Sequence, residues 1–229
     1  MAQSKPTTPT NPTADLLSGA VEGDPALAAP LDLLAARDPA LAAALAQAGL
    51  PPRRQGKTGF PGLLSIIVSQ QVSTASARAI MDRLHAALPE ATPAALLALD
   101  EGVLRAVGLS RPKMRYARAL AEDVLAKRFS FATLDGLNDA DAITYLCQAK
   151  GIGPWSAEIY LLFSLRRPDI MPAGDLALQV AAQRMKGLAD RPDESALRHL
   201  AEAWSPHRSA AARFLWHLYR QPGLIESDV

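Results

Sequence analysis

Two features of the segment between residues 146 and 178 have residue types and spacing that suit chemistry. The first is a Gly-x-Gly turn between two apolar helical runs. Glycine adopts backbone angles closed to other residues and lets another group approach closely. Backbone amides at such a turn, where a helix begins, favour an anion. The candidate donors are Gly151, Gly153, Trp155 and Ser156, with the Ser156 hydroxyl as an extra donor.

The second feature is a lone acidic residue, Asp175, which follows the turn and opens another helical pattern. A carboxylate there can stabilise a developing positive charge or orient a water molecule. Each feature also has a purely structural explanation. A Gly-x-Gly turn is often only a corner between helices, and Asp before a helix is a common N-cap. Glu158 is the acidic alternative to Asp175.

The composition bounds the class of protein that these features serve. The 229 residues are 49% hydrophobic and only 5% aromatic, which favours helices over sheets. The net charge of +1 gives no global signal for a polyanion, so a nucleic-acid surface must be a local patch. The single cysteine, Cys147, excludes an internal disulfide, a cysteine zinc site and a four-cysteine iron–sulfur cluster. Polar residues or Pro interrupt every apolar run, so we expect no contact with a membrane.

Helical periodicity and capping residues predict an all-α fold of about ten short helices and no sheet. Residues 1–24 are rich in Pro, Thr and Ser and are expected to form a disordered or loosely packed tail. Residues 25–229 are expected to form one helical domain. The main predicted helices are two within 25–50, two within 60–88, and those at 100–107, 111–127, 154–166, 175–186, 193–203 and 207–220.

Four sequence blocks, in order, carry a resemblance to a known family. They are Ser69–Ser73 (SQQVS), Gly108–Lys113 (GLSRPK), Lys150–Asp175 with its KGIGPWSAE turn and Pro-x-x-Asp end, and Trp204–Ser209 (WSPHRS) with Trp216 beyond it. Together they resemble the helix–hairpin–helix DNA glycosylases of the HhH-GPD superfamily, especially the 3-methyladenine DNA glycosylase II branch. The resemblance covers residues 60–220 and places the hairpin motif at about 142–166.

This resemblance implies a compact, two-lobed helical fold with an active-site cleft between the lobes. Asp175 matches the catalytic carboxylate. Trp155 stands where bifunctional members have a Lys that attacks the sugar, so the lyase step should be absent and water should be the nucleophile. Gln71, with Gln70 beside it, matches the wedge that enters the duplex. Aromatic residues expected to line the base pocket are Trp155, Tyr160 and Trp216.

The implied partner is double-stranded DNA that contains alkylated bases, of the 3-methyladenine and 7-methylguanine type. No cofactor is required, although main-chain carbonyls of Cys147, Ala149 and Ile152 are candidates to hold a structural Na⁺ or K⁺. We expect a cytoplasmic monomer, associated with the nucleoid in a bacterium, and no N-terminal mixed α/β domain. The alternative is a non-catalytic helix–hairpin–helix module that binds damaged or duplex DNA. The sequence leaves the spectrum open among methylated purines, hypoxanthine and alkylated cytosine.

Overall fold

The computed structural model describes residues 23–221, which are helical. In this range the one β-type contact is an isolated bridge between Gly23 and Pro52. The α-helices are α1 (Ala28–Ala35), α2 (Pro39–Ala48), α3 (Gly59–Ser69), α4 (Thr74–Ala87), α5 (Pro93–Ala98), α6 (Glu101–Ala106), α7 (Arg111–Leu125), α8 (Asp139–Leu146), α9 (Pro154–Ile159), α10 (Leu176–Lys186), α11 (Glu194–Leu200) and α12 (Arg208–Tyr219). Short 3-10 turns span Pro25–Leu27, Phe131–Gly136 and Ala201–Trp204, and a π-helical turn spans Tyr160–Ser164.

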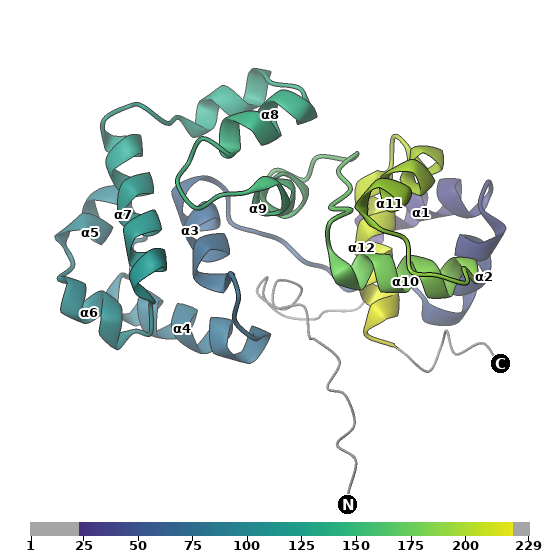
Figure 1. Ribbon diagram of the computed structural model, residues 1–229, viewed down its shortest axis with the longest axis horizontal. Helices are drawn as coiled ribbons and strands as arrows, with labels where there is room; N and C mark the ends of the chain where they lie inside the picture. The colour runs from purple at the N-terminus through teal and green to yellow at the C-terminus, as the bar shows by residue number, and fades with distance from the viewer. Residues whose placement is uncertain (1–22, 222–229) are drawn as a thin grey trace, which may run out of the picture.

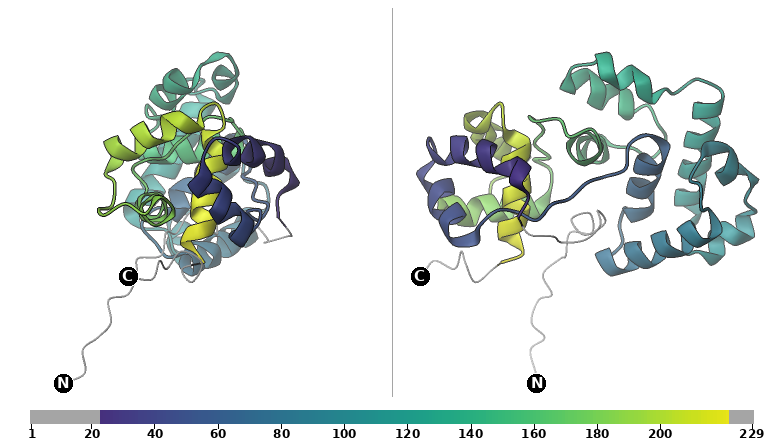
Figure 2. Two further views of the ribbon diagram at one scale, coloured as in Figure 1. Left: turned by 90° about the vertical axis from the view of Figure 1, so that its right-hand side faces the viewer. Right: turned by 180° about the vertical axis from the view of Figure 1, so that it is seen from behind.

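The helices form two groups, as the resemblance predicts (Figure 1). One group holds α3 to α8, and the other brings α1 and α2 from the start of the chain against α10 and α12 from its end. Helix α9 lies between the groups, and the view from behind shows the same separation (Figure 2). None of the helices in the described range has the length and apolar character that a membrane span requires.

Local capping rules explain where most helices begin. The side chains of Asp38, Ser73 and Asn138 each accept a backbone N–H in the first turn of the following helix, as expected for these residue types. The prediction of a single helix over 154–166 is wrong in its second half. There the chain passes from α9 into the π-helical turn, in which the Leu165 amide donates to the Tyr160 carbonyl.

The predicted tail, residues 1–24, lies outside the described residues except for its last two. Asp24 is buried and its carboxylate pairs with Arg213 at 2.8 Å. This pair attaches the start of the described chain to α12. Asp24 therefore belongs to the helical domain and not to the predicted tail.

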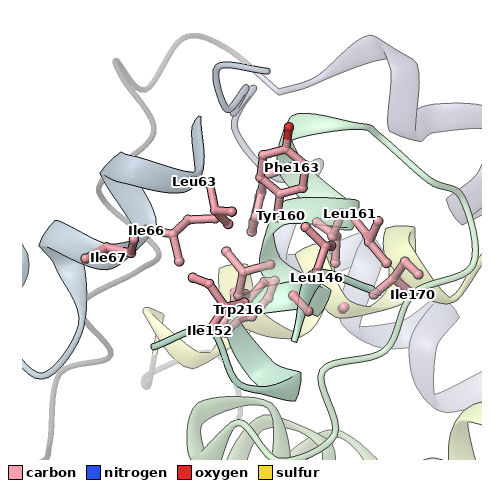
Figure 3. Close-up of a cluster of buried hydrophobic side chains, with 14 of the residues drawn as sticks. Leu63, Ile66, Ile67, Leu146, Ile152, Tyr160, Leu161, Phe163, Ile170 and Trp216 are labelled. Carbon is pink, nitrogen blue, oxygen red and sulfur yellow. The ribbon is translucent and has the colours of Figure 1, made fainter. Parts of the chain in front are cut away.

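Apolar packing fixes the hairpin to the core. Leu63 and Ile66 project from α3 toward the side chains of Ile152 and Tyr160 (Figure 3). Ile152, the residue between the two turn glycines, is 5% exposed. Burying a side chain of this size contributes about 1.5–3 kcal/mol. The Gly-x-Gly turn is thus held from inside by Ile152, while Gly153 is exposed.

A buried polar network joins α2 to the C-terminal helices. The Asp38 carboxylate accepts hydrogen bonds from the Trp204 indole at 2.8 Å and from the Lys186 ammonium at 2.7 Å, besides capping α2. Burial opposes ionisation of Asp38. The hydrogen bonds from Lys186, Trp204 and the Leu41 amide outweigh burial and hold the pKa of its carboxyl below the ordinary value.

Because the folded-state pKa of Asp38 is lowered, its contribution to stability is present above about pH 4 and is lost as pH falls through the folded-state pKa. We expect Asp38→Asn to lower the free energy of unfolding at pH 7 by about 1–3 kcal/mol. The variant should then lose less stability than the wild type on acidification. Urea unfolding between pH 7 and pH 3 checks this, with Asp32→Asn on the exposed face of α1 as control. Parallel acid losses in wild type and Asp38→Asn would contradict it.

Candidate active site

Asp175 begins α10 and has the geometry of an N-cap. Its Oδ1 accepts the amides of Ala177 at 2.9 Å and Leu178 at 3.3 Å, and the residue is only 5% exposed. The purely structural role expected for Asp175, that of an N-cap, is therefore present. The following helix is eleven residues long, and the positive end of its dipole faces the Asp175 side chain.

Capping alone does not account for the rest of the surroundings of Asp175. The indole N–H of Trp155 donates to Oδ2 at 3.0 Å, and the indole N–H of Trp216 donates to Oδ1 at 3.3 Å. Trp155 comes from α9 and Trp216 from α12, so three separate helices converge on one carboxylate. Hydrogen bonds to a charged group contribute about 1.5–3 kcal/mol each. The arrangement fixes the orientation of a buried negative charge.

The three aromatic residues expected in the base pocket differ in their contacts. Trp155 and Trp216 converge on Asp175, and Trp216 stacks on Phe163 with ring centroids 5.5 Å apart. Tyr160 is fully buried in the core, and its hydroxyl accepts the Gly59 amide at 2.8 Å. Burial raises the pKa of Tyr160 to about 12. Tyr160 is thus a core residue whose hydroxyl contacts the start of α3. The prediction that it lines the base pocket is corrected.

The loop that leads into Asp175 is held by the fourth sequence block. Arg208 binds Asp169 through two guanidinium nitrogens, each at 2.8 Å. The Ser209 hydroxyl accepts the Ile170 amide at 2.9 Å. These residues lie at the start of α12, two and three positions after the WSP sequence. The block therefore serves to position the acid.

The Gly-x-Gly turn has two glycines with different requirements. Gly151 has φ +86°, and a Cβ there would lie 2.3 Å from the ring of Tyr116. Both the backbone angle and the packing thus demand glycine. Gly153 has an ordinary φ of −100° and is exposed, and a Cβ there would meet nothing within 4 Å. Internal packing therefore does not explain the second glycine.

The two predicted wedge residues have different environments. Gln71 is exposed at the junction of α3 and α4, with φ +55°. Gln70 turns inward, and its side-chain amide donates to the Gly151 carbonyl at 2.9 Å and to the Ser156 hydroxyl at 3.2 Å. Ser156 is 4% exposed, so its hydroxyl is engaged inside the protein and the prediction that it is an outward donor is corrected.

Helix α7 supports both the junction and the hairpin, a link that the sequence analysis did not find. The Lys113 ammonium is buried and donates to the Val68 carbonyl at 2.6 Å, near the end of α3. Burial lowers the pKa of Lys113. One turn further along, Tyr116 packs on Gly151. The spacing Lys-x-x-Tyr places both residues on one face of the predicted helix, and this spacing could have indicated that α7 contacts the junction and the hairpin.

We expect Gln70→Ala to loosen the hairpin before any DNA is present. Loss of its two hydrogen bonds should speed hydrogen exchange at the amides of residues 151–156 and weaken duplex binding by about tenfold. Gln71→Ala is the matched control for hydrogen exchange, because its exposed side chain bonds neither turn residue, whereas its duplex binding is not used as a control. Unchanged hairpin exchange in Gln70→Ala would show that the side chain does not hold the turn.

Glu158, the acidic alternative to Asp175, is buried and forms an ion pair. It is 3% exposed and pairs with Arg198 of α11 at 2.9 Å. Arg198 also binds Glu194 at 2.9 Å and reaches the Met171 carbonyl at 3.4 Å. This set connects α9 to α11 and to the loop before Asp175. Its members lie far apart in sequence, so no local pattern marked them.

Burial raises the pKa of Glu158, and the Arg198 guanidinium only partly opposes that shift. A raised folded-state pKa gives stability that is present at low pH and lost as pH rises through it. We therefore expect Glu158→Gln to change the free energy of unfolding at pH 7 by less than about 1 kcal/mol, or to increase it. The reason is that Arg198 would still form its ion pair with Glu194. Base release should stay within about threefold of the wild type. A loss comparable to that of an Asp175 variant would contradict this.

Comparison with known proteins agrees with this geometry. Residues 64–206 match the model of the HhH-GPD superfamily base excision DNA repair proteins. The chain belongs to this superfamily. The match includes the α3–α4 junction, the Gly-x-Gly turn and Asp175.

Individual relatives fall in one branch of the HhH-GPD superfamily. The chain is 30% identical over 164 residues to "DNA-3-methyladenine glycosylase 1" of Schizosaccharomyces pombe, covering 70% of this chain and 72% of that protein. It is 28% identical to the "alkylbase DNA glycosidase-like protein mag2" of the same yeast, over 69% and 77% of the two chains.

Solved structures give the same result. The S. pombe 3-methyladenine DNA glycosylase Mag1 in complex with abasic DNA aligns with a TM-score of 0.74 and 28% identity, over 82% of this chain and 95% of that one. A Bacillus halodurans DNA-3-methyladenine glycosidase aligns with a TM-score of 0.73 and 30% identity, over 85% and 90%. The HhH-GPD match ends before Trp216, so the place of Trp216 at the site rests on its contact with Asp175.

Proposed function

We propose that this HhH-GPD protein is a monofunctional DNA glycosylase that flips alkylated bases out of duplex DNA and hydrolyses their N-glycosidic bonds in base excision repair. The observation that carries the proposal is the buried Asp175 carboxylate, oriented by the indoles of Trp155 and Trp216. The names of the relatives support 3-methyladenine as a substrate. We extend the range to 7-methylguanine.

The proposed chemistry needs only one carboxylate. Breaking an N-glycosidic bond gives the sugar oxocarbenium character, as in glycoside hydrolysis, and a nearby negative charge stabilises it. A base alkylated on a ring nitrogen is cationic, so it departs without a strong general acid. Water, oriented or deprotonated by Asp175, then adds to the sugar. The second acid nearby, Glu158, is paired with Arg198 and has no role in this scheme.

Trp155 supports hydrolysis over lyase chemistry. An indole nitrogen cannot form the Schiff base that a lysine nucleophile forms. Here the indole N–H instead holds the catalytic carboxylate. Borohydride should therefore trap no covalent complex between the protein and a lesion duplex. A trapped adduct would contradict the monofunctional assignment.

We propose that the turn and the junction grip the DNA on either side of the flipped base. The backbone amides of Gly151, Gly153, Trp155 and Ser156 are the candidates for a phosphate. The open space above Gly153 supports this, because a methyl group there would obstruct only a partner from outside. Gln71 is the proposed wedge, and Gln70 positions the turn through its hydrogen bonds to Gly151 and Ser156. Phosphate contacts would offset the few kcal/mol, roughly, that base flipping costs.

A structural Na⁺ or K⁺ at the hairpin remains part of the proposal. The donor set suits such an ion, since carbonyl oxygens are hard ligands. Within residues 23–221, no N–H group donates to the carbonyls of Cys147 or Ile152, whereas the Ala149 carbonyl accepts the Ile152 amide at 3.0 Å. The ion would add positive charge beside the phosphate. Residues that would hold it are Cys147, Ala149 and Ile152.

We further propose that the protein acts as a monomer on chromosomal DNA, and hence in the cytoplasm or nucleoid of a bacterium. The test of its specificity is a panel of duplexes with single lesions. Methylated adenine and guanine should be released faster than hypoxanthine, because a cationic base is a better leaving group than a neutral one. Equal release of the methylated purines and hypoxanthine, or preference for the neutral hypoxanthine, would overturn the chemical basis of the proposal.

A further inference from the structure

A cationic pocket lies apart from Asp175 and the hairpin turn. It has a volume of about 300 Å³ and is lined by four segments: the start of the described chain, the α2–α3 linker, the residues after the π-helical turn, and the beginning of α12. Five arginines contribute to the lining, and Asp24 is the single acid among the lining residues. These arginines are Arg53, Arg54, Arg166, Arg167 and Arg213.

The charges of Arg213 and Arg167 are matched within the protein. Arg213 is mostly buried and pairs with Asp24 at 2.8 Å, and Arg167 pairs with Asp139 at 2.8 Å. Arg53 and Arg166 are exposed, and neither forms an ion pair with any residue in the described range. Burial, together with the positive charge of Arg166, holds the pKa of Arg213 below its usual value despite Asp24. The pocket therefore has excess positive charge.

Arg166 occupies a position that favours a different residue. Its φ is +55°, in the left-handed region, and the Arg167 amide donates to the Leu161 carbonyl at 3.0 Å. This is the C′ position of a helix end, where glycine is the usual choice because it has no Cβ penalty. A chain that needed only the turn would be more stable with glycine. Arg166 lines the pocket in spite of this unfavourable backbone angle.

We propose that this pocket binds a phosphate group, held by the guanidiniums of Arg53 and Arg166 above Arg213. Guanidinium forks match phosphate oxygens in geometry and charge. Apolar lining from Leu27 and Leu162 suits the body of a small organic phosphate, and the volume is that of a small-molecule site. None of the residues proposed for catalysis or for the hairpin grip belongs to the lining, so the site is separate from the glycosylase centre.

The test uses the full chain and inorganic phosphate at constant ionic strength. A ligand that binds only the folded protein raises its melting temperature in a saturable way. Arg166→Gly removes the charge and relieves the left-handed backbone, so the variant should fold at least as well as the wild type while losing affinity for phosphate at least tenfold. Arg53→Gln should weaken binding as well. Single-turnover base release by both variants at saturating duplex should stay within about twofold of the wild type.

Lys127→Gly is the matched control. Lys127 is an exposed cation with φ +56° in the C′ position after α7, and the next residue, Arg128, donates its amide to the Asp123 carbonyl. The variant makes the same change in charge and backbone away from the pocket. It should bind phosphate as the wild type does. Equal phosphate effects on Arg166→Gly and Lys127→Gly, or no saturable effect on the wild type, would overturn the proposal.

A second arm identifies the source of the phosphate. An undamaged duplex is titrated into wild type and Arg166→Gly with and without phosphate. Competition, with at least tenfold weaker duplex binding by the variant, would assign the pocket to the DNA backbone. Independent binding of duplex and phosphate, with equal duplex affinity, would assign it to a free small-molecule phosphate. Both results support a phosphate site.

Discussion

Replacing Asp175 with Asn should reduce the rate of base release by about 100-fold or more, while duplex binding is retained. The amide oxygen can still accept the Ala177 and Leu178 amides, so the start of α10 should persist. The negative charge that would stabilise the sugar cation is lost. Single-turnover release of a methylated purine, measured beside a binding assay, separates the two effects.

The substitution also has a predictable effect on folding. In Asp175→Asn the side-chain NH₂ would face the Trp155 indole N–H, so two donors would meet where an acceptor now lies. This conflict should cost about 1–3 kcal/mol of stability. Asp193→Asn is the matched control, since Asp193 caps α11 by accepting the Ala196 amide at 2.8 Å and is exposed. If both variants released bases equally fast, Asp175 would be only a cap.

The second large effect is expected at the turn, where the two glycines should separate folding from binding. Gly151→Ala should destabilise the protein by about 2–5 kcal/mol, because it combines a left-handed backbone with a clash against the Tyr116 ring. Gly153→Ala should cost less than about 1 kcal/mol. Its methyl group would nevertheless lie where a phosphate must approach.

We therefore expect Gly153→Ala to weaken duplex binding by about tenfold with a melting temperature close to that of the wild type. Thermal unfolding and duplex titration at two salt concentrations check this. The salt dependence should also become shallower, because a phosphate contact is lost. Wild-type affinity in Gly153→Ala would mean that the DNA backbone does not approach this face of the turn.

Features that depend on residues close together in the sequence could be predicted, whereas contacts between residues far apart in the sequence could not. Helix starts at Asp38, Ser73 and Asn138 were predictable because a cap depends on residues a few positions away. The fold class followed from periodicity. The network of Glu158, Arg198 and Met171 was not predictable, because forty residues separate Glu158 from Arg198.

Tyr160 shows an error that helical geometry could have prevented. It lies five residues after Trp155, and at 3.6 residues per turn that places the two side chains about 140° apart. It shares a face with Ser156 instead, and both are buried. Trp216 was placed near Asp175 only by resemblance, and the contact that brings it there joins two helices 41 positions apart in sequence.

The most direct test of the account is the product formed from a duplex with a single 3-methyladenine or 7-methylguanine. Free base is identified by mass spectrometry, and the strand is examined before and after alkali. We expect the wild type to release intact methylated base and to leave an unbroken strand that alkali then cleaves. Tight binding to the lesion duplex with base release no faster than the spontaneous rate would contradict it and would favour the non-catalytic DNA-binding module.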